Sequence, residues 1–184
     1  MIFIGCCWAF ASVATVEGLH KLKTGNLISL SKQELVDCDT SSYDHGCDGS
    51  NSKVAYDYMI KRNKSLATKD NYPYQAKDGG ICRTTTVAHA SGAITITGYE
   101  NVPANNEDAL LKAVANQPVS VAIDINHGLT IEISIHEVTA VGYGTSNDGT
   151  KYSLLKNSWG KEWGESALDY KEMCPPRKVY VALL

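Results

Sequence analysis

The sequence predicts an α+β fold with two lobes, a helical lobe followed by a β-rich lobe. Before about residue 90 the apolar residues recur at helical spacing, and after it they form short runs typical of strands. Helices that precede strands in this way are typical of α+β proteins. With 184 residues, we expect one domain over 1–184, divided into a helical lobe over about 1–90 and a β-rich lobe over about 91–184.

Three helices are expected in the first lobe. Gly25 follows an apolar helical pattern and is a plausible stop signal for the first of them. Ser31 and Glu34 have the spacing of a capping box, which predicts the start of a short second helix. The expected helices cover residues 8–23, residues 32–36, and a segment around 55–59 that ends near Asn63.

The second lobe is expected to contain one helix and several strands. The helix covers residues 107–115 and is stopped by Pro118, which cannot continue it. Runs rich in valine, isoleucine and leucine predict strands, and the sequence Asn147-Asp148-Gly149 is typical of a turn between two of them. The expected strands cover residues 119–123, 138–141 and 152–155.

Composition excludes several classes of function. The formal net charge of −3 provides no basic face for nucleic acid, and no apolar run reaches the roughly 18 residues of a membrane span. Six cysteines indicate a compartment that permits disulfides, yet the first residues do not form a signal peptide. We therefore expect the chain to be a fragment or an incomplete version of a protein of the secretory pathway.

Six ordered motifs resemble the papain-like cysteine peptidases. They lie between residues 5 and 160, the pair Trp163-Gly164 extends the resemblance to residue 164, and the first motif surrounds Cys7 and Trp8. The doubled cysteine at 6–7 and the segment 163–166 are most similar to the senescence-associated vacuolar members from plants. The motifs read GCCWAF at 5–10, LSKQELVDCD at 30–39, GCDG at 46–49, YPY at 72–74, VGYG at 141–144 and KNSWG at 156–160.

The resemblance implies a thiol endopeptidase with Cys7 as nucleophile, His136 as base and Asn157 as the residue that orients it. His136 and Asn157 lie 129 and 150 positions after Cys7, close to the spacing in that family. The unpaired N–H groups at a helix start and an adjacent imidazolium both favour the thiolate form of a cysteine over the thiol. Trp159 would cover the bond between His136 and Asn157, and the backbone N–H of Cys7 would stabilise the oxyanion.

Cysteine and histidine residues also have structural and metal-binding roles in proteins. A lone cysteine on an apolar helix is usually an inert core residue, and this is the expectation for Cys6. His127 is the second candidate for the base, but it lacks the strand that follows His136. A metal site is disfavoured because the cysteines form no C-x₂-C pairs with matching histidines, and no cofactor is implied.

By the family pattern, Cys38 pairs with Cys82, which would tie the helical lobe together. Family members pair the counterpart of Cys47 with a cysteine three residues before the nucleophile, where this chain has Ile4. Cys47 is then either free or paired with Cys6, and Cys174 has no expected partner.

Four positions depart from the family pattern. Met1 stands where the family has the glutamine of the oxyanion hole, and Ile135 replaces a polar residue before the histidine. Glu137 stands where a small residue is usual, and we expect its carboxylate to crowd the site and perturb the imidazole. Ser50 replaces the second glycine of the pair that lies along bound substrate. The alternative, based on Met1, Ile135 and Glu137, is a catalytically impaired pseudo-enzyme or truncated relative that binds peptides or inhibitors.

The remaining expectations also come from the resemblance. Substrates are proteins or peptides, cystatin-like proteins are possible inhibitors, and the chain is a monomer with no nucleic-acid or membrane partner. The compartment is a vacuole, a lysosome-like compartment or the cell exterior. The residues expected to contact substrate are Gly49, Ser50, Asn51, Ser52, Ala122 and Ser134.

Overall fold

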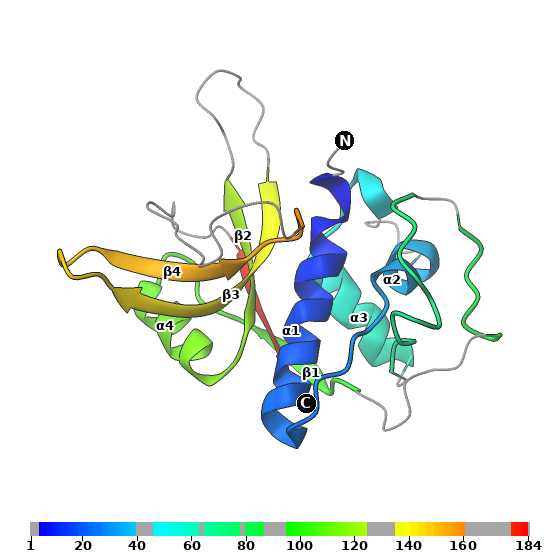
Figure 1. Ribbon diagram of the computed structural model, residues 1–184, viewed down its shortest axis with the longest axis horizontal. Coiled ribbons are helices and arrows are strands. Elements are labelled where there is room, and N and C mark those ends of the chain that lie inside the picture. Colours follow the sequence, from blue (N-terminus) through cyan, green and yellow to red (C-terminus); the bar gives the residue numbers. More distant parts are fainter. Residues whose placement is uncertain are drawn as a thin grey trace, which may run out of the picture.

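The structure is a computed structural model of residues 1–184, which describes residues 4–39, 46–62, 65–77, 80–86, 95–124, 135–160 and 178–183. It confirms the α+β arrangement, with three helices on one side, a sheet on the other, and the first helix next to the sheet (Figure 1). The helices are α1 (Cys7–Thr24), α2 (Lys32–Cys38), α3 (Ser52–Arg62) and α4 (Glu107–Asn116), with 3₁₀ turns η1 (Ile4–Cys6) and η2 (Gly46–Asp48).

Helix α1 is the central element of the molecule, because it contacts α2 and α3 as well as strands of the sheet. Residues on several sides of it are buried, among them Trp8, Val13 and Val16, as expected for a helix enclosed by other elements. It ends where the sequence predicts, because Gly25 adopts a left-handed conformation with φ of 77° and donates its N–H to Lys21 O at 2.9 Å.

Helix α2 begins at the predicted cap, since Ser31 Oγ accepts the N–H of Glu34 at 3.0 Å. The other half of the capping box is replaced by bonds to a neighbouring loop. The Glu34 carboxylate accepts the N–H of Ala67 at 2.6 Å, and the Ser31 N–H donates to Ala67 O at 2.8 Å. The helix start therefore also anchors the chain near residue 67.

The β-rich lobe contains a five-stranded antiparallel sheet in the order β1-β5-β2-β3-β4, with β1 and β4 at its two ends. Two of these strands, β1 and β5, were not predicted from the sequence. The strands are β1 (Gly98–Asn101), β2 (Val119–Asp124), β3 (Ile135–Thr145), β4 (Lys151–Lys156) and β5 (Lys178–Leu183).

Strand β3 belongs to the β-rich lobe and contacts helix α1 of the helical lobe. Its residues 136–140 are all buried, so both faces of this stretch are covered. Val138 and Ala140 belong to the hydrophobic core of the β-rich lobe, which includes residues of α4. On the α1 side, Thr139 Oγ1 donates to Ala11 O at 3.4 Å. A separate core lies under α1, α2 and α3, and it includes Trp8, Leu35 and Tyr56.

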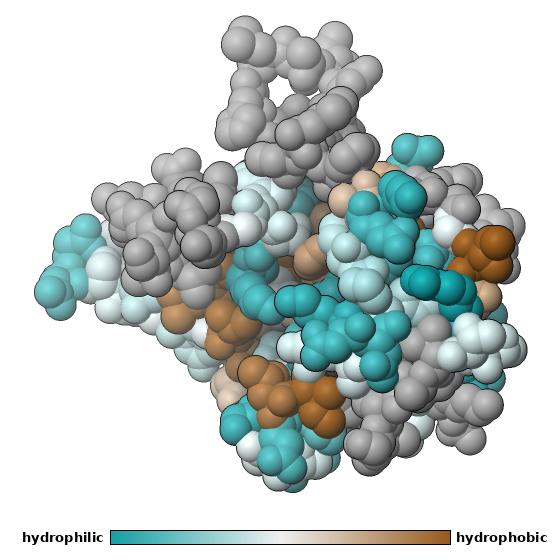
Figure 2. Space-filling model, turned by 45° about the vertical axis from the view of Figure 1, so that its right-hand side comes forward, coloured by the Kyte–Doolittle hydropathy of each residue, from teal (hydrophilic) through white to brown (hydrophobic). Residues whose placement is uncertain are grey.

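The described surface is mostly hydrophilic, and Figure 2 shows hydrophobic residues in several places on one face. None of the helices in the described ranges is long and apolar enough to cross a membrane. The exposed large hydrophobic residues of the described part are Leu22, Leu27, Ile81, Ile135, Val141 and Tyr143.

Candidate active site

The predicted nucleophile, Cys7, is the first residue of α1 and is 8% exposed. Among the described residues it is the one cysteine outside a disulfide. The structure therefore gives it the position that the sequence predicts, at the end of a helix where backbone N–H groups are unpaired.

The start of α1 is held against η2 by close contacts. Cys6 forms a disulfide with Cys47, and Trp8 Nε1 donates to Gly46 O at 2.9 Å. A Cβ atom on Gly5 would lie 1.3 Å from Cys47 O, so only glycine allows the two backbones to approach this closely. Cys6 is thus not the inert core residue that was expected, because its sulfur pairs with Cys47. The second disulfide, Cys38–Cys82, forms as the resemblance implies.

The predicted base and its orienting residue meet on the sheet side. His136 near the start of β3 is completely buried, and its Nε2 lies 2.9 Å from Asn157 Oδ1, just after β4. The same Oδ1 accepts the backbone N–H of Ser158 at 2.7 Å, which identifies this amide atom as the oxygen. His136 Nε2 must therefore carry the proton, and Nδ1 carries a lone pair. Nδ1 has no hydrogen-bond partner among the described residues.

Trp159, expected to cover this pair, lies against the imidazole. Its ring stacks on the His136 ring with 5.0 Å between the ring centroids and 26° between the planes.

Cys7 contacts β3 at the residue next to His136. The backbone N–H of Glu137 donates to Cys7 Sγ at 3.3 Å, although the two residues are 130 positions apart in the chain. The structure therefore brings the nucleophile to the strand that carries the predicted base. Of the other predicted site residues, Met1, Ser134 and the alternative base His127 lie outside the described residues.

Burial is the largest cause of the pKa shifts of both Cys7 and His136. Burial is the main reason that the pKa of the Cys7 thiol rises to about 11; the Glu137 carboxylate adds to the rise, and the N–H of Glu137 opposes it. Burial also lowers the pKa of His136, and the hydrogen bond to Asn157 opposes that change. Burial therefore opposes the thiolate that the helix start and an adjacent imidazolium favour.

Glu137 does not crowd the imidazole as the sequence suggested. Its side chain is buried and turns to α3, where its carboxylate accepts the Ser52 N–H at 3.1 Å. It also accepts the hydroxyls of Ser52 and Ser120. Sequence reasoning missed Ser120, which gave no signal beyond its place in a predicted strand.

The remaining predicted substrate contacts lie around the start of α3 and on β2. Gly49 has φ of 125°, a conformation that favours glycine. The buried hydroxyl of Ser50 has no hydrogen-bond partner among the described residues. Asn51 caps the next turn by accepting the Val54 N–H at 3.3 Å. Ser52 and Ala122 are buried.

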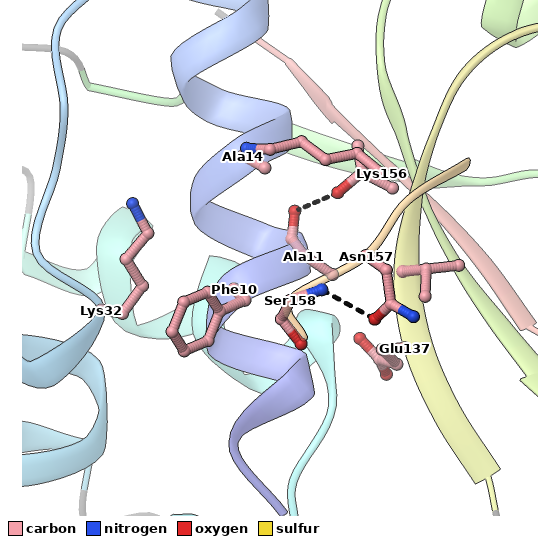
Figure 3. A pocket seen from close by; sticks show the side chains of 10 residues that line it. Phe10, Ala11, Ala14, Lys32, Glu137, Lys156, Asn157 and Ser158 are labelled. Atoms are coloured by element: carbon pink, nitrogen blue, oxygen red, sulfur yellow. Dashed lines mark hydrogen bonds between the residues drawn. The ribbon is translucent and has the colours of Figure 1, made fainter. Parts of the chain in front are cut away.

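A pocket of about 30 Å³ lies between α1 and the segment that carries Asn157 (Figure 3). Phe10 and Ala11 line it from α1, and Glu137 and Ser158 from the other side. It has room for a water molecule or two, which is too little for a substrate side chain. It is therefore a small cavity beside the segment that carries Asn157.

The comparisons with known proteins agree with this geometry. The family model described as papain family cysteine protease matches residues 4–175. A senescence-specific cysteine protease of Oryza sativa subsp. indica, SAG39, is 52% identical over 174 residues, which cover 88% of this chain and 50% of that protein. SAG12 of Arabidopsis thaliana, also described as senescence-specific, is 47% identical over 174 residues, covering 88% and 49%. The chain spans about half the length of the curated relatives it matches.

Two solved structures share the fold. Bromelain from Ananas comosus, in complex with the E64 inhibitor, has a TM-score of 0.83 and 37% identity, covering 98% of this chain and 89% of that chain. The proform of the ragweed pollen allergen Amb a 11 has a TM-score of 0.83 and 35% identity, covering 97% and 58%. Together with the family match, these similarities mean that the chain belongs to the papain family of cysteine proteases.

Proposed function

We propose that the chain is an endopeptidase that hydrolyses peptide bonds, with Cys7 as nucleophile, His136 as base and Asn157 as the residue that orients the imidazole. The observation that carries the proposal is the hydrogen bond between His136 and Asn157, which leaves Nδ1 as the free acceptor. The contact of Cys7 with the next residue of β3 supports it, since it brings the thiol to the same part of the strand.

The reaction proceeds in two acyl-transfer steps. As Cys7 Sγ attacks the carbonyl carbon of the substrate, His136 Nδ1 takes the thiol proton, because a neutral thiol is a weak nucleophile. His136 then gives this proton to the leaving amine, and a thioester remains on Cys7. Water, deprotonated by His136, hydrolyses the thioester and regenerates the thiol. Asn157 keeps the imidazole in the tautomer that each transfer needs, and it stabilises the imidazolium through Nε2–H.

The N–H groups at the start of α1 supply the oxyanion donors. The backbone N–H of Cys7 is unpaired within the helix because it belongs to the first turn. In relatives a glutamine side chain adds a second donor, and loss of one such donor costs about 10²–10³ in rate. Met1 holds that position here, so we expect a slower enzyme than its relatives.

Substrates are proteins or peptides that bind along residues 49–52. The main chain of Gly49 and Ser50 would pair with the substrate backbone as an added strand. The pocket for the substrate residue two before the cleaved bond would be bordered by Asn51, Ser52, Ala122 and Ser134.

The chain acts as one domain over 1–184, as a monomer, in a vacuole, a lysosome-like compartment or outside the cell. Cystatin-like proteins are candidate inhibitors.

A second candidate is a relative that binds peptides or inhibitors with little turnover. The departures at Met1, Ile135 and Glu137 favour this alternative, because the loss of one oxyanion donor alone costs about 10²–10³ in rate. The two candidates make opposite predictions for reagents that need an assembled catalytic pair.

Covalent labelling with an epoxide inhibitor of the E64 type separates the two candidates. The folded chain is treated, its intact mass is measured, and the adduct is located by peptide mapping, with Cys7→Ala as the control. A single adduct on Cys7, together with cleavage of a peptide substrate, supports the endopeptidase. Folded protein that gains no adduct and cleaves no peptide contradicts it and favours the binding protein.

A further inference from the structure

Glu137 makes two kinds of contact from one position on β3. Its backbone N–H donates to Cys7 Sγ at 3.3 Å. Its carboxylate, on a residue that is 5% exposed, accepts the Ser52 N–H at 3.1 Å through Oε2 and 3.3 Å through Oε1. The hydroxyl of Ser52 also donates to Oε2, and that of Ser120 lies 3.4 Å from the same oxygen. One residue thus joins β3 to the start of α1 and to the start of α3.

The partner of the carboxylate is the first residue of an 11-residue helix. Unpaired N–H groups and the partial positive charge of a helix start stabilise an anion at this place. Hydrogen bonds to a charged acceptor are about twice as strong as those between neutral groups. The arrangement therefore provides a strong contact between a strand of the β-rich lobe and a helix of the helical lobe.

Serine hydroxyls complete the set of donors. Ser52 and Ser120 are both completely buried, and their Oγ atoms lie 2.5 Å apart. Because the Ser52 hydroxyl proton points to Glu137, the Ser120 hydroxyl is left to donate to Ser52 or to Glu137. Ser120 lies on β2, so the network links β2, β3 and α3.

We propose that Glu137 is a positioning residue for the catalytic pair: its carboxylate holds β3 on the start of α3, and so holds the neighbouring His136 and its own N–H against Cys7. This inference rests on the proposed function, because it assumes that Cys7 and His136 react together. A rotation of β3 away from α3 would move the imidazole and the Glu137 N–H away from the thiol at the same time. Misplacement by about 1 Å can lower a rate about 100-fold.

The carboxylate has a second effect that the experiment must separate from positioning. Its negative charge disfavours the Cys7 thiolate. Among the described residues, Glu137 carries the charge that acts on the thiol, and the titratable His136 is its neighbour on β3. Glu137→Gln removes the charge and keeps an acceptor oxygen for the Ser52 N–H, whereas Glu137→Ala removes both.

Two kinds of reagent distinguish the effect of charge from that of positioning. Iodoacetamide alkylates any accessible thiolate, so its rate against pH reports the thiol titration, and the pH at half-maximal rate should fall in both variants. The epoxide inhibitor and a peptide substrate need the assembled pair. We expect Glu137→Gln to keep their rates within about threefold of the unmodified chain, and Glu137→Ala to lose about 10- to 100-fold.

Controls address stability and the proposed function itself. Glu34→Gln alters another buried carboxylate that accepts a backbone N–H, so it should lower the melting temperature without moving the alkylation profile. Equal epoxide and peptide rates in Glu137→Gln and Glu137→Ala would overturn the positioning role. If the unmodified chain is alkylated on Cys7 but cleaves no peptide, the endopeptidase proposal fails. The positioning role is then judged by whether Glu137→Ala, unlike Glu137→Gln, loses hydrogen-exchange protection at the Glu137 N–H.

Discussion

Asn157 Oδ1 lies 2.9 Å from His136 Nε2 while it also accepts the Ser158 N–H at 2.7 Å. The second bond prevents the amide from turning its nitrogen towards the imidazole. The first then keeps the His136 proton on Nε2 and the lone pair on Nδ1. The backbone just after β4 thus controls the tautomer of a residue 21 positions earlier.

Asn157→Ala should slow peptide hydrolysis mainly through kcat. Without the acceptor, His136 can hold its proton on either nitrogen and can rotate, so a smaller fraction of molecules is ready for proton transfer. We expect kcat to fall about 10- to 100-fold with little change in KM. Steady-state kinetics measure this, and Asn116→Ala, on the exposed side of α4, is the matched control. An unchanged kcat would contradict the assigned role.

Trp159→Ala should move the acidic limb of the pH–rate profile upward. Burial lowers the pKa of His136, and the stacked indole provides part of that burial. Without it, the pKa rises towards the ordinary value of about 6.5, so the base becomes protonated at a higher pH. The pH dependence of kcat/KM measures the shift. Trp159→Phe keeps a stacked ring and should stay close to the unmodified profile; an equal shift in both variants would contradict this explanation.

Most elements were predictable because their signals are local. Gly25 ends α1 through its own conformation, and Ser31 caps α2 through a bond to a residue three positions away. Strands β1 and β5 were missed because they depend on pairing with each other over about 80 residues. The short strand β1 has no clear alternation, whereas Val179, Val181 and the residues around them did offer a β-branched signal.

The site shows the same division between local and distant information. The family motif indicated Cys7, His136 and Asn157; in the structure His136 pairs with Asn157, and Cys7 contacts Glu137, the residue next to His136. The partner of Cys47 stayed open because disulfide pairing cannot be deduced from sequence alone. The orientation of Glu137 depends on Ser52, which lies 85 positions away on the other lobe. No local sequence pattern reveals such a contact. The pKa of the Cys7 thiol cannot be predicted from local sequence either, because it depends on burial in the folded protein.

The double variant Cys6→Ala/Cys47→Ala should be destabilised and should react more slowly. Removal of a disulfide of this kind usually costs about 2–4 kcal/mol in free energy of unfolding, which urea denaturation measures. Because this bond holds η1 on η2, we also expect slower epoxide labelling of Cys7.

Cys38→Ala/Cys82→Ala is the matched comparison for this prediction. It removes a disulfide with a similar sequence separation, 44 residues against 41, and its bond begins at the end of α2. It should lose similar stability with a smaller effect on labelling. Peptide mapping under non-reducing conditions that finds Cys6 and Cys47 as free thiols would contradict the pairing.

Stability should decrease on both sides of neutral pH because Cys7 and His136 are buried in their neutral forms. The folded pKa of Cys7, about 11, exceeds its ordinary value of 9.0, so its contribution is complete below pH 9 and is lost as the pH rises towards 11. The rise in the pKa of Cys7 from 9.0 to about 11 corresponds to about 3 kcal/mol at most in the free energy of unfolding. The pKa of His136 is lowered, so its contribution is present above about pH 6.5 and is lost as the pH falls through the folded value.

Urea denaturation at a series of pH values measures the loss of stability on both the acidic and the alkaline side. Burial also raises the pKa of Tyr56 and Tyr58, so the alkaline limb is taken as the difference between the unmodified chain and Cys7→Ala. Identical pH dependence in the two proteins between pH 8 and 10 would mean that the thiol is not held neutral by burial.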